Sequence, residues 1–482
     1  MSSKSTVNNF FWKFSERITA QVVTLVVSII LARILEPSHY GIISIVTIFI
    51  TLANVLVSDG FGSALIQKKD ADALDFYSVL YFNIVLSMVL YIILFMAAPS
   101  IANFYGDGYE ILTPVLRVLG IRIIISGINS VQQAYVSRKM IFKKFFIATS
   151  FGTVLSAVVG IYMAYKGFGV WALVAQYLTN TTVDTLVLNR SLKLKPKIMF
   201  SFDRLKKLIP YGVGILGTKL LITGYQELRA LLIGKVYTSA DLAYYDKGRQ
   251  FPKLIVTNID TSIGSVLFPK MSKQQDDPLQ IKQFTRKSIR YSSYLMCPMM
   301  LGLAAVADSF VKIILTDKWL PCVGLMRVFC IIYLFQPIHT ANMQAIKAIG
   351  RSDVYFKLEL FKKVIELIAL FISIRISVNA IAVSTALLTT SYTIVNAFPN
   401  RKLLNYPYKE QFADIMPSVC MSLVMLIVVI GIGKAVNGIY VKVIVQILVG
   451  MGMYLLLSLI TKNEVLFYIF DMIKRKKLHG KK

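Results

Sequence analysis

The chain has 482 residues, of which 56% are hydrophobic and only 16% are charged, and its mean hydropathy is +0.64. A soluble globular protein carries about 25% charged residues, so the composition excludes that class. The net charge of +28 would suggest a nucleic-acid partner in a soluble protein. In a membrane protein it indicates basic cytoplasmic loops, and we expect no nucleic-acid partner here.

Apolar runs recur along the whole chain, and each is long enough to cross a bilayer. They predict an all-α polytopic membrane protein with about 14 transmembrane helices. We expect the spans near residues 15–35, 40–64, 77–99, 110–135, 145–165, 169–190, 208–234, 240–268, 286–308, 322–348, 356–377, 379–400, 412–433 and 440–461.

The loops between these spans alternate in charge. Basic clusters stand in every second loop, as at Lys68/Lys69 and Arg138/Lys139, and the tail carries KRKK at residues 474–477. Basic loops face the cytoplasm in most membrane proteins. The pattern therefore predicts that both termini are cytoplasmic, which requires an even number of spans.

Cations also fall inside the expected spans, where each costs about 2.5–3.5 kcal/mol on insertion scales. Such side chains usually face a bundle interior or a water-filled cavity. We therefore predict a cationic cavity that binds the substrate. The candidate residues are Arg17, Arg117, Lys219, Arg229, Lys247, Arg249 and Arg327.

The two halves of the chain resemble each other. GSALIQK at 62–68 matches GSVLFPK at 264–270, and LRVLGI at 116–121 matches MRVFCI at 326–331. The repeat relates Arg117 to Arg327 and Arg17 to Lys219. It predicts two six-helix lobes of the same orientation, related by a pseudo-twofold axis along the membrane normal.

The repeat also sets the expected domains. We expect an N-lobe over residues 1–200, a C-lobe over 201–405, an extra helix pair over 406–462 and a basic cytoplasmic tail over 463–482.

GVGILG, with Gly212, Gly214 and Gly217, has the G-x-G-x-x-G spacing of a dinucleotide-binding loop. That loop needs a preceding strand and a soluble βαβ unit, whereas here Pro210 opens an apolar span. Proline and glycine weaken a helix where neighbouring groups can satisfy the backbone. The stretch is interpreted as a hinge in the seventh span.

A cationic cavity suits an anionic substrate such as a phosphate or pyrophosphate. Amides and tyrosines in the spans could contact sugars or could join helices to each other; they are Asn129, Gln132, Gln133, Tyr211, Tyr225, Gln226, Tyr244, Tyr245, Asn342 and Gln344. The acids Glu16, Asp59, Glu227 and Asp246 either pair with the cations or couple transport to protons or sodium.

No catalytic or metal-binding pattern stands in the sequence. Its three histidines form no H-E-x-x-H motif, its four cysteines form no C-x-x-C pair, and no large soluble domain interrupts the spans. We expect a protein that is not an enzyme and that has neither a metal nor another cofactor.

Three stretches resemble the bacterial polysaccharide exporters of the multidrug/oligosaccharidyl-lipid/polysaccharide superfamily. They are ARILEPSHYGIISIVTIFITLANVLVSDGFGSALIQKKD (32–70), GFGVWALVAQ (167–176) and GRSDVYFKLELFKK (350–363). The resemblance is strongest to the colanic acid and teichuronic acid exporter branch of the Wzx-type lipid-linked oligosaccharide flippases. It covers most of the first twelve spans, and its motifs are structural.

This resemblance implies a MATE-like fold that opens alternately to each side of the bacterial inner membrane. The implied substrate is an undecaprenyl-pyrophosphate-linked oligosaccharide, and the implied partners are polysaccharide polymerase and chain-length proteins. The resemblance implies a cavity lined by cations of the first, second, seventh and eighth helices. Here Arg17, Lys219, Lys247 and Arg249 occupy the first, seventh and eighth spans, while the second holds Asp59 where some family members have a cation. Two alternatives remain: an ion-coupled small-molecule antiporter of the same fold, and a polytopic polysaccharide polymerase or ligase.

Overall fold

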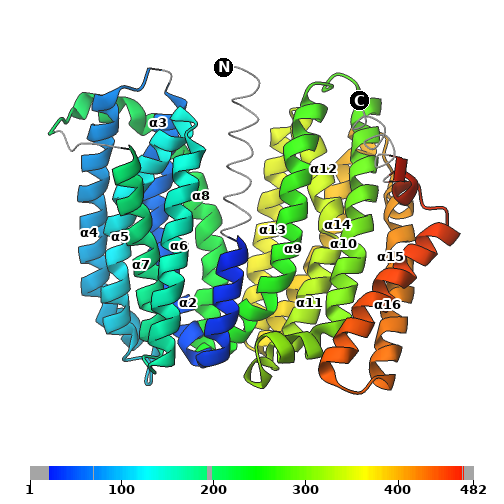
Figure 1. The fold of residues 1–482 in the computed structure, drawn as a ribbon. Helices are drawn as coiled ribbons and strands as arrows, with labels where there is room; N and C mark the ends of the chain where they lie inside the picture. Colours follow the sequence, from blue (N-terminus) through cyan, green and yellow to red (C-terminus); the bar gives the residue numbers. More distant parts are fainter. Residues whose placement is uncertain (1–20, 69, 193–197, 469, 472–482) are drawn as a thin grey trace, which may run out of the picture. The chain divides into compact units, whose positions relative to one another are not determined.

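The computed structural model describes residues 21–68, 70–192, 198–468 and 470–471 (Figure 1). These residues form helices joined by short loops, with no strand among them. By its contacts the chain divides into two compact units, Met1–Ala243 and Tyr244–Lys482. The helix α9 (Ser239–Ser272) begins in the first unit and continues in the second.

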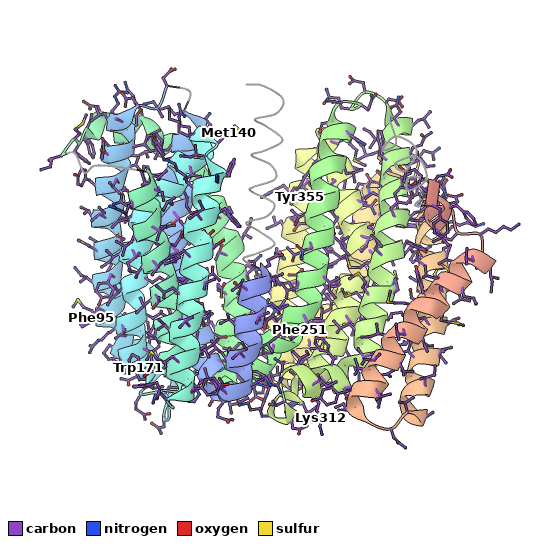
Figure 2. All side chains as sticks on the ribbon, viewed as in Figure 1. Phe95, Met140, Trp171, Phe251, Lys312 and Tyr355 are labelled. Atoms are coloured by element: carbon purple, nitrogen blue, oxygen red, sulfur yellow. The ribbon has the colours of Figure 1, made fainter. Side chains whose placement is uncertain are left out.

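The first unit holds one unlabelled helix, Gln21–Ile34, and the helices that follow it. These are α2 (Pro37–Asn54), the π-helix η1 (Val55–Asp59), α3 (Gly60–Gln67), α4 (Ala73–Tyr105), α5 (Leu112–Lys139), α6 (Phe142–Tyr165), α7 (Val170–Leu192) and α8 (Phe202–Val236). Successive long helices run between two ends of the unit, where Figure 2 labels Met140 and Trp171.

The helix α8 packs on α2, α3 and α4 and so belongs to the first unit by its contacts. This division of the chain falls after the boundary at 200/201 that we expect between the lobes. The lobe boundaries therefore stay a prediction.

The second unit holds most of α9 and the remaining helices. These are α10 (Pro278–Ile314), the short 3₁₀-helix η2 (Asp317–Trp319), α11 (Cys322–Leu334), α12 (Gln336–Ala348), α13 (Ser352–Ser373), α14 (Val378–Leu403), α15 (Tyr408–Ala435) and α16 (Ile439–Ile460). Figure 2 labels Lys312 at one end of this unit. The core lies mainly around α10, which packs on α11, α12, α15 and α16.

Each expected span lies on helical residues of the structure, the first over its described part only. Nine stretches among the described residues are long and apolar enough to cross a membrane. The helices α7, α8, α9 and α13 fall outside that set, and α8 and α9 carry many of the candidate charges. The count of fourteen spans therefore stays a prediction.

One expected span, which the structure has as the apolar stretch Cys322–Ala348, contains a break in its helix. The run 322–348 forms two helices, α11 and α12, with Phe335 between them and Pro337 in the first turn of α12. Proline has no amide hydrogen and its ring crowds the preceding turn. The break therefore follows from Pro337, although the apolar run continues across it.

Candidate functional site

The beginning of α8 is held by an ionic cluster in the first unit. The side chain of Ser201 caps the helix by accepting a hydrogen bond from the amide of Arg204. The guanidinium of Arg204 lies 3.5 Å from Asp72 and 3.7 Å from Asp75. Lys68 lies 2.6 Å from the carboxylate of Asp75, which is fully buried. The cluster joins the ends of α3, α4 and α8.

The predicted hinge and three of the candidate charges lie along α8. The G-x-G-x-x-G stretch is helical throughout, and no strand precedes it among the residues that the structure describes, so it is not a nucleotide-binding loop. Gly217 and Lys219 are exposed, while Glu227 and Arg229 are partly buried. The helix is continuous from Phe202 to Val236 through Pro210, Gly212 and Gly214.

Three candidate charges lie near the beginning of α9 and differ in their surroundings. The guanidinium of Arg249 lies 3.3 Å from the carboxylate of Asp246, and both side chains are about a third exposed. Lys247 is buried in the second unit, where its Nζ lies 5.6 Å from the centre of the Trp319 ring. Arg249 is therefore partly exposed in this structure and Lys247 is buried, and a role of either in substrate binding stays a prediction.

The repeat-related arginines each contact the helix that precedes them. The Nε of Arg117 donates to the carbonyl oxygen of Phe95 on α4, at 3.3 Å. The Nε of Arg327 donates to the carbonyl oxygen of Ala304 on α10, at 3.2 Å, and its guanidinium also pairs with Asp308. Each arginine thus joins two helices of its own unit. A role of Arg117 and Arg327 in the substrate cavity stays a prediction.

Some predicted site residues cannot be placed. Arg17 and Glu16 lie outside the described residues. Asp59 is the last residue of η1.

A polar pocket that composition alone does not reveal lies in the first unit. Its volume is about 310 Å³, and α2, η1, α3 and α5 line it. Its polar lining consists of amides and hydroxyls: Asn54, Ser58, Ser126, Asn129, Ser130, Gln133 and Ser137.

A hydrogen-bond network fixes the α5 side of this pocket. The Nδ2 of Asn129 donates to the carboxylate of Asp184 at 3.2 Å and to the hydroxyl of Thr185 at 3.1 Å, both on α7. The amide of Gln133 in turn donates to Asn129. The contacts with α7 fix the Asn129 side chain, and Asn129 in turn orients Gln133, whose own side chain is exposed.

The composition of the pocket indicates its chemistry. Hydroxyls and amides both donate and accept hydrogen bonds, and none of the lining residues in the described part of the chain is charged. Such a surface suits a neutral polyhydroxylated group such as a sugar. It does not by itself suit a phosphate, which would need cations.

The sequence contains a signal for this pocket. Asn54, Ser58 and Gly62 follow each other at intervals of four, as do Asn129, Gln133 and Ser137. Residues four apart lie on one face of a helix. Our sequence prediction included Asn129 and Gln133 but not the serines.

Comparison with known proteins finds relatives that are named for polysaccharide biosynthesis and transport. A family model described as "Polysaccharide biosynthesis protein" matches residues 30–324. The succinoglycan biosynthesis transport protein ExoT of Rhizobium meliloti is 23% identical over 99% of this chain and 97% of its own length. The teichuronic acid biosynthesis protein TuaB of Bacillus subtilis is 24% identical over 79% of each chain. The lipopolysaccharide biosynthesis protein WzxC of Escherichia coli is 21% identical over 90% of this chain and 89% of its own length.

Solved structures confirm the predicted fold class. The lipid II flippase MurJ in an inward closed conformation has a TM-score of 0.78 at 15% identity, over 95% of this chain and all of its own. An inward-facing multidrug resistance MATE transporter has a TM-score of 0.62 at 14% identity, over 80% of this chain and 94% of its own. At these identities the likeness shows the fold alone. The all-α, MATE-like membrane fold expected from the sequence is thus confirmed.

Proposed function

Because the chain belongs to the family of polysaccharide biosynthesis proteins, we propose that it is a flippase for a lipid-linked oligosaccharide. The observation that carries this proposal is the similarity to ExoT, which covers nearly the whole of both chains and which is named as a transport protein. The substrate proposed is an undecaprenyl-pyrophosphate-linked repeat unit. It would move from the inner to the outer leaflet of the bacterial cytoplasmic membrane, with both termini of the protein in the cytoplasm.

The cations of α8 and α9 are proposed to bind the pyrophosphate. Lys219 is exposed on α8, and Arg249 is partly exposed beside Asp246. Each of these two side chains can contact an anion without breaking a contact with a buried partner. Lysine and arginine bind phosphate through charge-assisted hydrogen bonds. We include Arg17 and Arg229 in this proposed set, and Asp246 and Glu227 as the acids that pair with the cations or couple to protons or sodium.

The polar pocket beside η1 is proposed to receive part of the oligosaccharide. It offers amides and hydroxyls that can replace the water lost from sugar hydroxyls. Asn129 and Gln133 are oriented by the network that ends on Asp184. We thus propose that the cations bind the pyrophosphate and that the uncharged pocket binds the sugars.

Alternating access by two six-helix lobes is the proposed mechanism, with bending of α8 near Pro210, Gly212, Gly214 and Gly217. The exported units would pass to a polysaccharide polymerase and its chain-length partner. A small-molecule antiporter of the same fold is less well supported, because the family and its relatives are named for polysaccharide biosynthesis. A polymerase or ligase is less well supported because ExoT is named for transport.

Transbilayer movement of a labelled undecaprenyl-pyrophosphate oligosaccharide in liposomes tests the proposal. We expect movement with the wild-type protein and its loss in Arg17→Ala, Lys219→Ala and Arg249→Ala. Lys312→Ala is the matched control, because Lys312 is an exposed cation in the last turn of α10 that pairs with Asp317. Absence of movement by the wild type, with and without a proton or sodium gradient, would contradict the flippase proposal.

A further inference from the structure

A second, larger cavity opens in the first unit between α4, α5 and α7. Its volume is about 570 Å³, within the range of about 300–1,000 Å³ that small-molecule sites occupy. The wall is mostly apolar, with Leu80 and Ile84 from α4, Ile128 from α5 and Leu186 from α7. It lies toward the beginning of α4 and the ends of α5 and α7. This cavity has no lining residue in common with the polar pocket beside η1.

One buried amide in this cavity lacks a hydrogen-bond partner. Gln132 lines the cavity and is 2% exposed, and neither its Nε2 nor its Oε1 has a partner within the described part of the chain. An unpaired buried amide costs roughly 1–3 kcal/mol. The next amide along the helix, Gln133, is hydrogen bonded to Asn129. The orphaned amide therefore points to a ligand with a hydrogen-bonding group at this depth.

The cavity is polar at one end and apolar at the other. Two charged residues line its polar end, which we call the mouth: Lys139, exposed at the end of α5, and Asp72, whose carboxylate already lies 3.5 Å from the guanidinium of Arg204. Gln132 is seven residues before Lys139, about 10 Å along the helix axis at about 1.5 Å per residue. A helical side chain leans toward the N-terminus of its helix, which for Lys139 is the direction of Gln132. Ile128 lies one further turn from the mouth.

We propose that this groove binds an anionic glycerophospholipid of the surrounding bilayer. The lipid phosphate contacts Lys139, an ester carbonyl accepts a hydrogen bond from the Nε2 of Gln132, and an acyl chain lies against Leu80, Ile84 and Ile128. A basic residue near a membrane surface attracts anionic lipid by about 1 kcal/mol. A polyprenyl chain fits the wall but has no acceptor for the buried amide, so the contacts favour a glycerophospholipid. The site is independent of the proposed transport function.

Photocrosslinking tests the proposal on the full chain. The protein is placed in vesicles of phosphatidylethanolamine and phosphatidylglycerol with a trace of phosphatidylglycerol that carries a diazirine in one acyl chain. We expect adducts on α4 and α5 at the groove. Gln132→Leu should lower them about three- to tenfold, the range for one lost hydrogen bond. Gln133→Leu, the same change one residue away, should leave them unchanged.

Two further arms keep the test decisive. Gln132→Leu replaces an unpaired amide by an apolar side chain of similar size, so its melting temperature should be equal or higher. Lys139→Gln changes an exposed residue and should remove the preference for phosphatidylglycerol over a matching phosphatidylethanolamine probe. Groove adducts that persist unchanged in both variants would overturn the proposal. So would stronger groove labelling by a diazirine polyprenyl phosphate than by the phosphatidylglycerol probe.

Discussion

Arg117 satisfies a backbone group of α4 that a proline leaves without its helical partner. Its Nε donates to the carbonyl oxygen of Phe95 at 3.3 Å, and its guanidinium lies 4.3 Å from the centre of the Phe95 ring. In an uninterrupted helix that carbonyl would bond to the amide of residue 99, which here is Pro99. The second unit contains a similar arrangement. The Tyr454 hydroxyl donates at 2.9 Å to the carbonyl oxygen of Tyr294, which lacks its helical partner because residue 298 is a proline.

This relationship predicts that Arg117 matters for stability through Pro99. We expect Arg117→Ala to lower the stability by about 1 kcal/mol, the usual net value of one hydrogen bond. In a Pro99→Ala background the restored amide bonds to the Phe95 carbonyl, and Arg117→Ala should then cost much less. Thermal unfolding of the four proteins in detergent measures the coupling. Equal losses of stability in both backgrounds would show that Arg117 does not act through the Phe95 carbonyl.

The polar pocket predicts a separation between sugar and phosphate recognition. Gln133→Leu removes an exposed amide from the pocket and should slow movement of the undecaprenyl-pyrophosphate oligosaccharide by about three- to tenfold, as expected for one lost hydrogen bond. Movement of undecaprenyl pyrophosphate without sugars should change little. The liposome assay with both lipids measures this. An equal slowing of both lipids would place Gln133 outside sugar recognition.

Two glycines of α8 allow a matched test of the proposed hinge. A Cβ added at Gly217 or at Gly224 would have no described atom within 4 Å. Alanine should therefore fit at both sites and favour the helix by about 1 kcal/mol. If α8 bends near Gly217, Gly217→Ala should slow flipping while Gly224→Ala does not. Melting temperatures confirm the fold of each variant, and identical flipping rates would argue against a hinge there.

The extra helix pair is anchored to α10 by a buried carboxylate. Asp414 of α15 accepts hydrogen bonds from Arg286 at 2.8 and 2.9 Å, from Arg290 at 2.7 Å and from the Tyr406 hydroxyl at 2.7 Å. Burial and the neighbouring Asp414 carboxylate raise the pKa of Tyr406, so its hydroxyl remains a donor.

We predict that Asp414→Asn is destabilising, since it removes the buried carboxylate that Arg286 and Arg290 share and leaves each arginine with one more exposed acid, Glu410 or Glu464. Breaking a buried pair costs about 3–5 kcal/mol, and the loss here should be smaller because both arginines are about a third exposed. Asp353→Asn is the control, because Asp353 pairs with Arg351 at 2.9 Å on the surface. That change should leave the melting temperature unaltered. Similar shifts for both variants would contradict the buried anchor.

The spans could be predicted because they depend on local composition. Hydropathy places the helices but does not predict the break near Pro337, where α11 ends and α12 begins. It also misses the length of α4 and α10, which continue past the apolar core of their spans. Helix ends depend on caps such as Asp72 and Asp277 rather than on hydropathy.

The site is less predictable because the environment of a charge depends on neighbouring helices. Arg249 and Lys247 are two residues apart, yet one is partly exposed and the other is buried near Trp319. Nothing local to Arg117 indicates the carbonyl of Phe95, which lies on another helix. The polar pocket has a local signature in its four-residue spacing, but its depth depends on how η1 lies against α5.

The π-helix η1 determines the rotational phase of everything that follows it on the same span. A π-helical turn bonds each amide one residue further back than an α-turn does, and each residue of an α-helix advances by about 100°. The five residues of η1 advance the chain by about as much as four α-helical residues, so deleting one residue from Val55–Asp59 would return this turn to α-helix and leave the phase of α3 nearly unchanged. Inserting one residue there would instead rotate α3 by about 100° relative to α2. Lys68, at the end of α3, would then turn away from Asp75. A single insertion would in this way reshape the polar pocket and release the ionic cluster at the start of α8.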